Sequence, residues 1–232
     1  MKPLLIDNLS VKVIKSKRRK TVAIKVVDEI VSIHIPEKLP LLIAEAFVTK
    51  KASWIKKKLQ QQSQRLANEK QFIEGEQLQF LGQNYTLKLT KASGPISISQ
   101  TINDIICQGR PQNLNFKSIR NALITWYRAQ ATEYLTKRTQ LLAKQTRLDT
   151  GDITVKSYKA RWGSCNVKGD LQYNWKLILA SPAIIDYVII HELCHTRHHN
   201  HSKAFWQLVE QLCPDFKTAR QWLKANGYLL TI

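Results

Sequence analysis

The stretch of residues 182–195 constrains how this chain can fold more than any other. Its first nine residues are apolar nearly all round, and Ser181 followed by Pro182 is a typical helix start, so a buried helix is expected there. The stretch ends in an HELCH sequence in which His191 and His195 are four positions apart. Because a helical turn takes about 3.6 residues, both imidazoles should project from one face of the helix.

The two histidines, with Glu192 directly after the first, form the HExxH pattern that is typical of zinc peptidases. Imidazole is a good zinc ligand, and the glutamate is placed to activate water at the metal. Two core histidines beside a helix-capping glutamate are the competing interpretation. It is disfavoured because an unpaired polar side chain is costly at the end of a buried helix, and metal ligation removes that cost. We therefore predict His191 and His195 as zinc ligands and Glu192 as the catalytic residue.

Three further histidines follow and compete for the position of third ligand. His198 lies seven helical residues after His191, a rise of about 10.5 Å, which is too far for both to reach one ion with bonds of about 2 Å. His199 is no better placed. A ligand beyond the end of the helix can fold back toward the ion, which favours His201. Glu210 is the alternative, and the fourth position is left to water, as a catalytic zinc requires.

Residues 1–112 are expected to form a β-rich, basic amino-terminal domain with one amphipathic helix. β-branched residues cluster at 10–14, 21–27 and 30–35, and a tight hairpin is expected around Gly82. Short strands should follow near 96–98 and 105–107. Between these two β regions, residues 41–67 carry apolar residues at helical spacing, Trp54 among them, with lysines on the other face.

Residues 113–232 are expected to form the catalytic domain, which gives an α+β chain. Its predicted elements are a helix over about 118–147, strands near 153–164 and 171–179, the helix from Pro182, a helix over about 202–212, and a last one from Pro214. Four side chains near the predicted metal site are candidates for stabilising the oxyanion: Tyr173, Tyr187, His198 and His199.

The chain is strongly basic, with a formal net charge of +19. Residues 1–70 hold 16 Lys and Arg against 6 Asp and Glu. Such a field attracts polyanions, so a nucleic-acid partner through this basic region is one expectation. The other is a surface whose charge only keeps the protein in solution.

The remaining composition indicates a soluble cytoplasmic protein without a membrane partner. No secretory signal is visible, and no apolar run approaches the roughly 20 residues that span a bilayer. The four cysteines form no CxxC pair, which is typical of reduced thiols. Cys165 and Cys194 are expected to be small buried residues rather than metal ligands. The sequence gives no indication of oligomeric state.

Several sequence blocks occur together in an ordered series. They are residues 161–165 (RWGSC), 174–178 (NWKLI), 185–188 (IDYV) leading into the HELCH sequence, and 200–206 (NHSKAFW). In these blocks the chain resembles the YgjP-like family of zinc metallopeptidases, relatives of the SprT-like proteases. The resemblance implies His191, His195 and His201 as zinc ligands and Glu192 as the catalytic residue. It also implies a zincin-like core, in which an edge hairpin lies beside the active-site helix.

The function predicted from these observations is zinc-dependent hydrolysis of peptide bonds in a protein or peptide substrate, with Glu192 as the general base. Two alternatives from other classes remain. One is a nucleic-acid-binding protein with a structural zinc, which would need a fourth protein ligand that the sequence does not obviously offer. The other is a metal-dependent hydrolase of a non-peptide bond.

Overall fold

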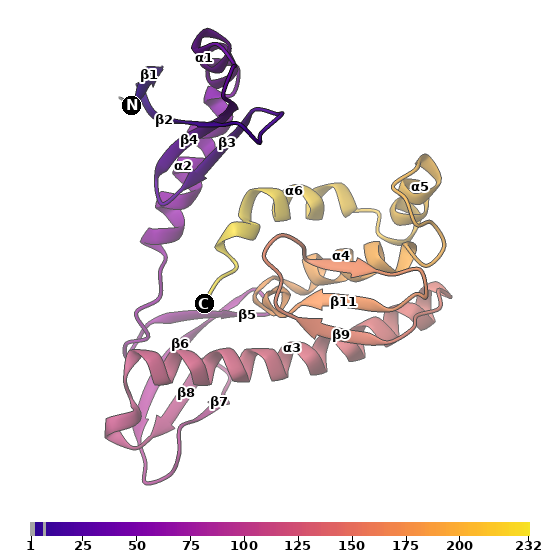
Figure 1. Ribbon diagram of the computed structural model, residues 1–232. Helices are drawn as coiled ribbons and strands as arrows, with labels where there is room; N and C mark the ends of the chain where they lie inside the picture. The colour runs from indigo at the N-terminus through magenta and orange to yellow at the C-terminus, as the bar shows by residue number, and fades with distance from the viewer. Residues whose placement is uncertain (1–2, 7) are drawn as a thin grey trace. The chain divides into compact units, whose positions relative to one another are not determined.

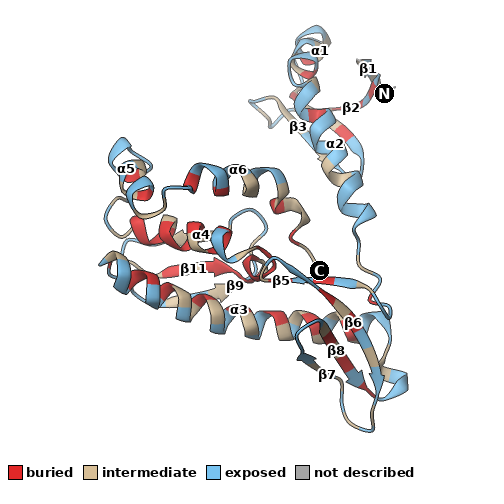
Figure 2. Cartoon of the chain, turned by 180° about the vertical axis from the view of Figure 1, so that it is seen from behind, coloured by how far each residue is buried: buried red, intermediate tan, exposed pale blue. Residues whose placement is uncertain are grey.

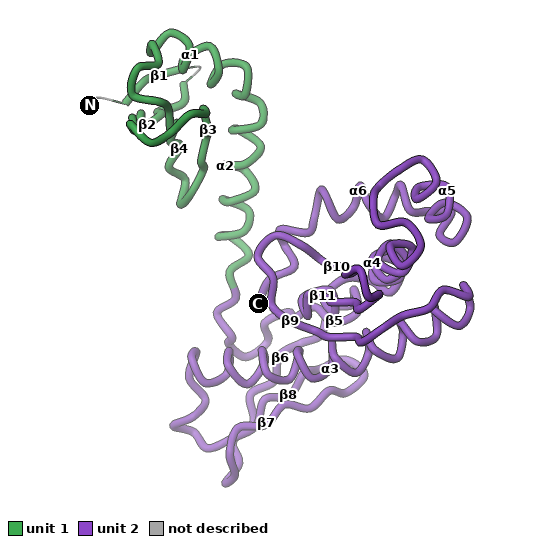
Figure 3. Tube along the Cα trace, turned by 45° about the vertical axis from the view of Figure 1, so that its right-hand side comes forward, with its two compact units in different colours: residues 1–69 green, residues 70–232 purple. Residues whose placement is uncertain are grey.

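The computed structural model describes residues 3–6 and 8–232, which form a mixed α/β protein with small sheets (Figure 1). The chain divides into two compact units, residues 1–69 and 70–232 (Figure 3). Each unit has its own hydrophobic core. Within the described part of the chain, no helix has both the length and the apolar character needed to cross a membrane.

The first unit is a four-stranded sheet packed against two helices. Its elements are β1 (Leu4–Ile6), β2 (Leu9–Ser16), β3 (Ala23–Val27), β4 (Ile30–Pro36), α1 (Leu41–Lys50) and α2 (Ala52–Ala67). The strand order is β1-β2-β4-β3, with β2 and β4 parallel. Buried and more accessible residues alternate along both central strands, as expected when one sheet face is covered. Val11 and Ile33 from that face share a core with Val48 of α1 and Ile55 of α2.

The single helix expected over residues 41–67 is two helices in the structure. They are separated at Lys51, whose φ of −105° and ψ of 6° depart from helical geometry. The side that packs on the core carries Ala44, Val48 and Ile55, which is not the set of apolar positions that the sequence pattern favoured. Of the apolar residues in this stretch, Ile55 is fully buried, whereas Leu42 and Trp54 are 77% and 42% exposed.

The second unit contains the long helix and two further sheets. Its elements are β5 (Gln77–Phe80), β6 (Gln83–Lys91), β7 (Ser97–Gln100), β8 (Asp104–Gly109), α3 (Phe116–Thr146), β9 (Ile153–Lys156), β10 (Gly163–Cys165), β11 (Leu171–Asn174), α4 (Pro182–Cys194), α5 (Lys203–Leu212) and α6 (Phe216–Asn226). One sheet has the order β5-β6-β8-β7 and the other β10-β11-β9. A 3₁₀ helix, Trp175–Leu179, follows β11 where the sequence predicted more strand.

The tight hairpin expected around Gly82 joins β5 to β6. Phe80 pairs with Gln83, so the turn consists of Leu81 and Gly82, one residue earlier than expected. Both have positive φ, 50° and 75°, as a two-residue turn matched to the twist of a hairpin requires. A Cβ added to Gly82 would lie 2.7 Å from the Cα of Ser181, so the turn also needs glycine for this close approach to the start of α4.

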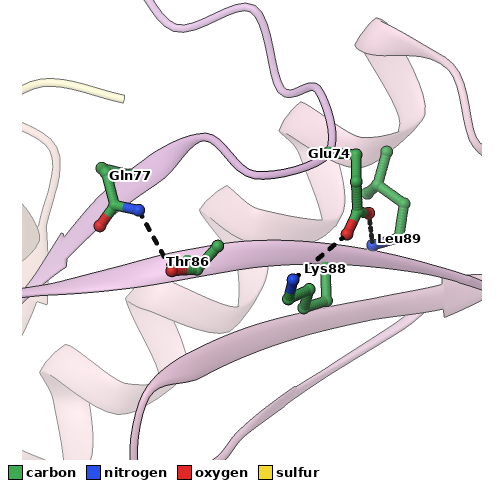
Figure 4. A network of polar contacts seen from close by, with 5 residues as sticks. All are labelled: Glu74, Gln77, Thr86, Lys88 and Leu89. Atoms are coloured by element: carbon green, nitrogen blue, oxygen red, sulfur yellow. Dashed lines mark hydrogen bonds and ion pairs between the residues drawn. The ribbon is translucent and has the colours of Figure 1, made fainter.

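Polar contacts extend along the outer side of β6 (Figure 4). The Gln77 amide donates to the Thr86 hydroxyl at 3.1 Å across the β5–β6 pair. Further along β6, the carboxylate of Glu74 accepts from the Leu89 backbone N–H at 2.6 Å and lies 3.7 Å from the Lys88 ammonium. The two contacts of Glu74 attach the segment before β5 to the sheet.

The boundary between the two compact units falls after Glu69, whereas the sequence pattern favoured a domain boundary after residue 112. The physical reason is that β5–β8 share one hydrophobic core with α3 and α4. The Tyr127 hydroxyl of α3 donates to the Gln79 carbonyl at 2.7 Å, and the Leu81 N–H donates to the Ile178 carbonyl at 2.7 Å. The sheet of β5–β8 is therefore part of the unit that contains the histidines.

The sheet beside α4 has an order that the sequence did not indicate. β11 is central: β9 pairs with it in parallel, and β10 pairs with it antiparallel on the other side. The strand expected near 153–164 is thus two strands on opposite sides of a third. β10 lies at the sheet edge and packs next to α4.

A paired salt bridge connects α3 to α4. Arg138 donates through Nε and a terminal nitrogen to the two carboxylate oxygens of Asp186, at 2.7 and 2.6 Å. The two side chains are only 32% and 22% exposed. We expect Arg138→Ala to lower the free energy of unfolding, measured in urea, by about 1–2 kcal/mol, because it leaves a half-buried carboxylate without its partner.

The matched control is Lys137→Ala, which removes the neighbouring cation of the same helix. Its salt bridge to Glu133 is also short, 2.7 Å, but both side chains are largely exposed. Exposed ion pairs contribute little to stability, so the urea midpoint of this variant should stay close to that of the wild type. Equal losses in the two variants would contradict a special role for the α3–α4 pair.

Candidate metal centre

The HELCH sequence lies at the end of α4, the most buried helix of the second unit (Figure 2). Ser181 is the residue before the first turn and Pro182 opens the helix, as the sequence predicted, although Ser181 makes no side-chain cap hydrogen bond. The helix is buried nearly all round before it reaches His191. Its last helical residue is Cys194, and His195 follows with helical φ and ψ.

Three histidine side chains converge at this end of α4. The Nε2 atom of His201 lies 3.1 Å from Nε2 of His191 and 3.2 Å from Nε2 of His195. His201 comes from the loop between α4 and α5, after the chain has turned back toward the helix. One ligand nitrogen from each ring lies within 4.8 Å of both others.

This geometry fits a single metal ion. Nitrogens bound at about 2.0–2.1 Å in a tetrahedral site are about 3.3–3.4 Å apart, close to the two separations in the cluster. A shared cation would attract the lone pairs of all three nitrogens at these separations. His191, His195 and His201 are therefore the residues that could hold a metal here.

The other side chains considered from the sequence lie outside the histidine cluster. Glu210 is exposed on α5 and accepts a hydrogen bond from Lys217 at 2.8 Å. His199 lines the cleft in front of the cluster. Within the part of the chain that the structure describes, neither Cys165 nor Cys194 joins the three histidines. Cys194 is buried, as expected, and Cys165 is half-buried at the cleft wall.

The rings of the cluster are held in different ways. Nδ1 of His195 lies 2.9 Å from the His198 carbonyl, which fixes Nδ1 as the protonated nitrogen and leaves the Nε2 lone pair for the cluster. The His201 ring stacks on Trp206 with centroids 5.5 Å apart and planes at 23°. Nδ1 of His191 is buried and, among the described residues, has no hydrogen-bond partner. Packing therefore positions His191 and His201, and a backbone hydrogen bond positions His195.

Burial sets the charge state of His191. Desolvation lowers the pKa of this imidazole to about 3 in the metal-free protein, with smaller contributions from His195, His201 and Arg220. Burial also lowers the pKa of His195, against the opposing effect of its bond to the His198 carbonyl. At neutral pH His191 is thus a neutral ring, the form that binds metal.

Glu192 is buried beside the cluster, only 6% exposed. Burial raises the pKa of its carboxyl group to about 7, and the charge of Arg161 opposes this rise. The carboxylate lies against Gly163 of β10: a Cβ added to that glycine would lie 2.6 Å from Oε1 and 2.7 Å from Cγ of Glu192. Sequence reasoning did not assign this role to Gly163, although a glycine inside a strand is a recognised signal of close approach.

A cleft of about 560 Å³ opens in front of the three histidines. Its walls are the histidines of the cluster with Glu192, and on the other side β10 with the turn that follows it; the lining residues are Gly163, Ser164, Cys165, Asn166, Val167, His191, Glu192, His195, His199 and His201. The backbone of an edge strand therefore borders the carboxylate and the ligand nitrogens.

Of the four oxyanion candidates, Tyr173, Tyr187 and His198 are not among the residues that line the cleft. Tyr173 is fully buried, and its hydroxyl accepts a 3.3 Å hydrogen bond from Thr139. The Tyr187 ring is 5.9 Å from the His191 ring but only 6% exposed. His198 contributes its carbonyl to His195, and His199 lines the cleft. His199 is thus the candidate that borders the open space.

Comparison with protein families assigns the chain. The model of the YgjP-like metallopeptidase domain matches residues 20–226. The chain belongs to the YgjP-like metallopeptidase family. A comparison with curated proteins gives no match. Membership implies a metallopeptidase with a bound metal ion and a peptide substrate, and the three histidines of this YgjP-like chain are a group that could bind such an ion.

A methyl group at position 163 should displace the carboxylate of this YgjP-like metallopeptidase. Gly163→Ala places a Cβ where the Glu192 side chain lies, and that side chain is more easily moved than the backbone. Because a misplacement of about 1 Å can reduce a rate about 100-fold, we expect a loss of peptidase activity of that order with the metal content unchanged. Both are measured on the purified protein.

Gly94→Ala is the control for this substitution. A Cβ at Gly94 meets nothing within 4 Å, and the residue is not in the left-handed region. Its activity and metal content should equal those of the wild type. An active Gly163→Ala variant would show that Glu192 can adopt another productive position.

Proposed function

We propose that this protein is a zinc-dependent peptidase in which His191, His195 and His201 hold the metal and Glu192 is the general base. The observation that carries the proposal is the convergence of three Nε2 atoms, with separations of 3.1 and 3.2 Å, at the end of the helix that also presents Glu192. Membership of a metallopeptidase family supports the same reading of the site.

Zinc is the metal that the donor set favours. Three neutral imidazoles with no carboxylate among the ligands suit a borderline-soft ion rather than calcium or magnesium, which prefer oxygen. When bound, zinc lowers the pKa of a water molecule to about 7 and polarises a carbonyl group. Three protein ligands leave one tetrahedral position open, as in catalytic rather than structural zinc sites.

Glu192 supplies the proton transfers. Its carboxylate takes the proton of the attacking water and returns it to the nitrogen of the leaving amine, so the carboxylate is regenerated at the end. Gly163 leaves the space that this side chain occupies, and the neighbouring Arg161 favours its ionised form. The buried position keeps bulk water away from the carboxylate.

The substrate is an extended peptide that lies along β10. This strand pairs with β11 on one side, and its other side borders the cleft. A peptide backbone can add to such an edge through main-chain hydrogen bonds, with little dependence on side-chain identity. An active-site helix beside a small sheet with an antiparallel edge strand is also why we propose a zincin-like core.

The test combines metal analysis with hydrolysis. We expect about one zinc ion per chain and cleavage of an unfolded protein substrate that a chelator abolishes and added zinc restores. A structural zinc site predicts bound zinc without cleavage, and a hydrolase of another bond predicts cleavage of an ester but of no peptide. Either of these results would contradict the proposal.

A further inference from the structure

The outer face of α2 in the first unit presents an exposed tryptophan among cations. Trp54, Lys58, Gln61 and Arg65 are spaced four, three and four positions apart, so they form a row along one side of the helix, with Lys57 beside it. We call these five residues the Trp54 face. Its tryptophan is 42% exposed, whereas the next residue, Ile55, lies about 100° further round α2 and is fully buried in the core.

The Trp54 face carries positive charge without neighbouring carboxylates in the sequence. Between Glu45 and Glu69 the chain has six lysines and arginines and no aspartate or glutamate. The amino groups extend into solvent, and Lys58 donates to the neutral Gln61 side chain at 3.2 Å. A helix of this kind has a strong local positive potential along its exposed side.

Trp54 is exposed without an evident structural purpose. The partly buried apolar side chains that pack against the core of the first unit include Leu59 of α2 and Phe47 of α1, but Trp54 is not among them. An indole at the surface offers a flat, polarisable ring, and here that ring is one helical turn from Lys57 and Lys58. The exposed part of the ring is therefore available to a planar ligand that carries negative charge.

We propose that the Trp54 face binds single-stranded nucleic acid: an unpaired base stacks on Trp54, and the flanking phosphates contact Lys57, Lys58 and Arg65. Stacking on aromatic rings together with a cationic track is how proteins bind single strands without reading their sequence. A duplex would supply the phosphates but not the base, since its bases are already stacked within the helix. This proposal concerns the first unit and is independent of the peptidase proposed for the second.

A membrane surface fits the Trp54 face less well. A helix that lies in a bilayer inserts a broad apolar side, while its polar side faces water. The apolar side of α2 contributes Ile55 and Leu59 to the core of its own unit, and its exposed side has one aromatic ring among polar groups. The anionic membrane is kept as an outcome of the test.

The decisive measurement is the binding of the full-length protein to a fluorescent oligothymidylate, followed by anisotropy at several salt concentrations. Trp54→Ala should weaken binding by about 5- to 150-fold, equivalent to one lost base stack, without changing the salt dependence. Trp54→Phe should retain most of the affinity because it keeps a stacking ring. Leu42→Ala, which removes another exposed apolar side chain of this unit, should bind as the wild type does.

The contribution of the lysine charges to phosphate binding is tested separately with the double variant Lys57→Gln/Lys58→Gln. This variant should lower the slope of log affinity against log salt by about 1.4, because each phosphate contact with a single strand contributes about 0.7. The control is Lys117→Gln/Lys144→Gln, in which two exposed lysines of α3 are replaced. It should leave the slope nearly unchanged.

Three results would overturn the proposal. The first is equal affinity of the wild type and Trp54→Ala for the oligothymidylate. The second is that Trp54→Ala loses as much affinity for the matching duplex as for the single strand. The third is binding to phosphatidylserine vesicles without binding to the oligonucleotide. Glu192→Gln should bind the oligonucleotide as the wild type does, since α4 has no part in the Trp54 face. Failure of the peptidase proposal and failure of this one are therefore separately visible.

Discussion

Replacing Glu192 with Gln is expected to reduce the rate of peptide hydrolysis by about 10²- to 10⁴-fold, the usual contribution of a positioned general base. The amide has nearly the same shape as the carboxylate and fits the same space beside Gly163, but it cannot accept a proton. Glu192 is not one of the three residues that could hold the metal, so the zinc content per chain should stay the same. Hydrolysis of an unfolded protein and metal analysis on one preparation check both statements.

Stability provides a second readout for the same variant. Burial raises the pKa of Glu192 from its usual value near 4.5 to about 7, so in the metal-free protein its ionised form is disfavoured by folding. That penalty develops as pH rises from about 4.5 to 7 and is complete above 7. Metal-free Glu192→Gln should therefore be at least as stable as metal-free wild type at pH 8. Lower stability there would mean that lost activity reflects misfolding.

The exposed Glu133→Gln is the matched control. It makes the same chemical change on the surface of α3, away from the cleft. Its activity should equal that of the wild type. Full activity of Glu192→Gln on a peptide substrate would remove the general-base assignment.

The histidine site illustrates what local sequence can determine. Helix geometry brings His191 and His195 to one face, and the structure has both at the end of α4 next to each other. Reach alone disfavoured His198, and its ring indeed lies outside the cluster, while its carbonyl contacts His195. These inferences depend on a few residues within two helical turns, where rise and angle per residue are fixed.

The parts that the sequence did not indicate depend on contacts between distant residues. The turn residue Leu81 bonds to Ile178, nearly a hundred positions away, and this kind of contact joins β5–β8 to the second unit. The change from strand-rich to helix-rich sequence near residue 112 is real, but a change of secondary structure does not mark a separate core. The insertion of β11 between β9 and β10 has the same origin, because strand order is set by packing and not by local propensity.

Trp54 shows a different limit. Helical periodicity placed it on the apolar side of one helix over residues 41–67. The structure has two helices separated at Lys51, and their core side carries Ala44 and Ile55 while Trp54 is exposed. No proline or glycine marks that break in the sequence, so the usual signals of helix termination are absent. More than one set of apolar positions in this stretch has helical spacing, and Trp54 belongs to a set that is not the buried one.

Replacing His201 with Ala is expected to have the largest effect on metal binding. The variant keeps His191 and His195 but loses the nitrogen that lies 3.1 and 3.2 Å from theirs. Loss of a residue that only orients a ligand costs about 10- to 100-fold in metal affinity, so loss of a ligand should cost more than about 100-fold. Competition for zinc with a chelator of known affinity measures the change.

Two control variants, His199→Ala and Glu210→Gln, test whether a side chain near His201 holds the metal in its place. His199 lines the same cleft but does not join the cluster, and Glu210 accepts its hydrogen bond from Lys217. Both variants should bind zinc as the wild type does. If Glu210→Gln lost zinc and His201→Ala kept it, the third ligand would come from α5 and the loop histidine would have another role. The stack of His201 on Trp206 favours His201 as the third ligand, because it holds the imidazole of a loop residue in a fixed orientation.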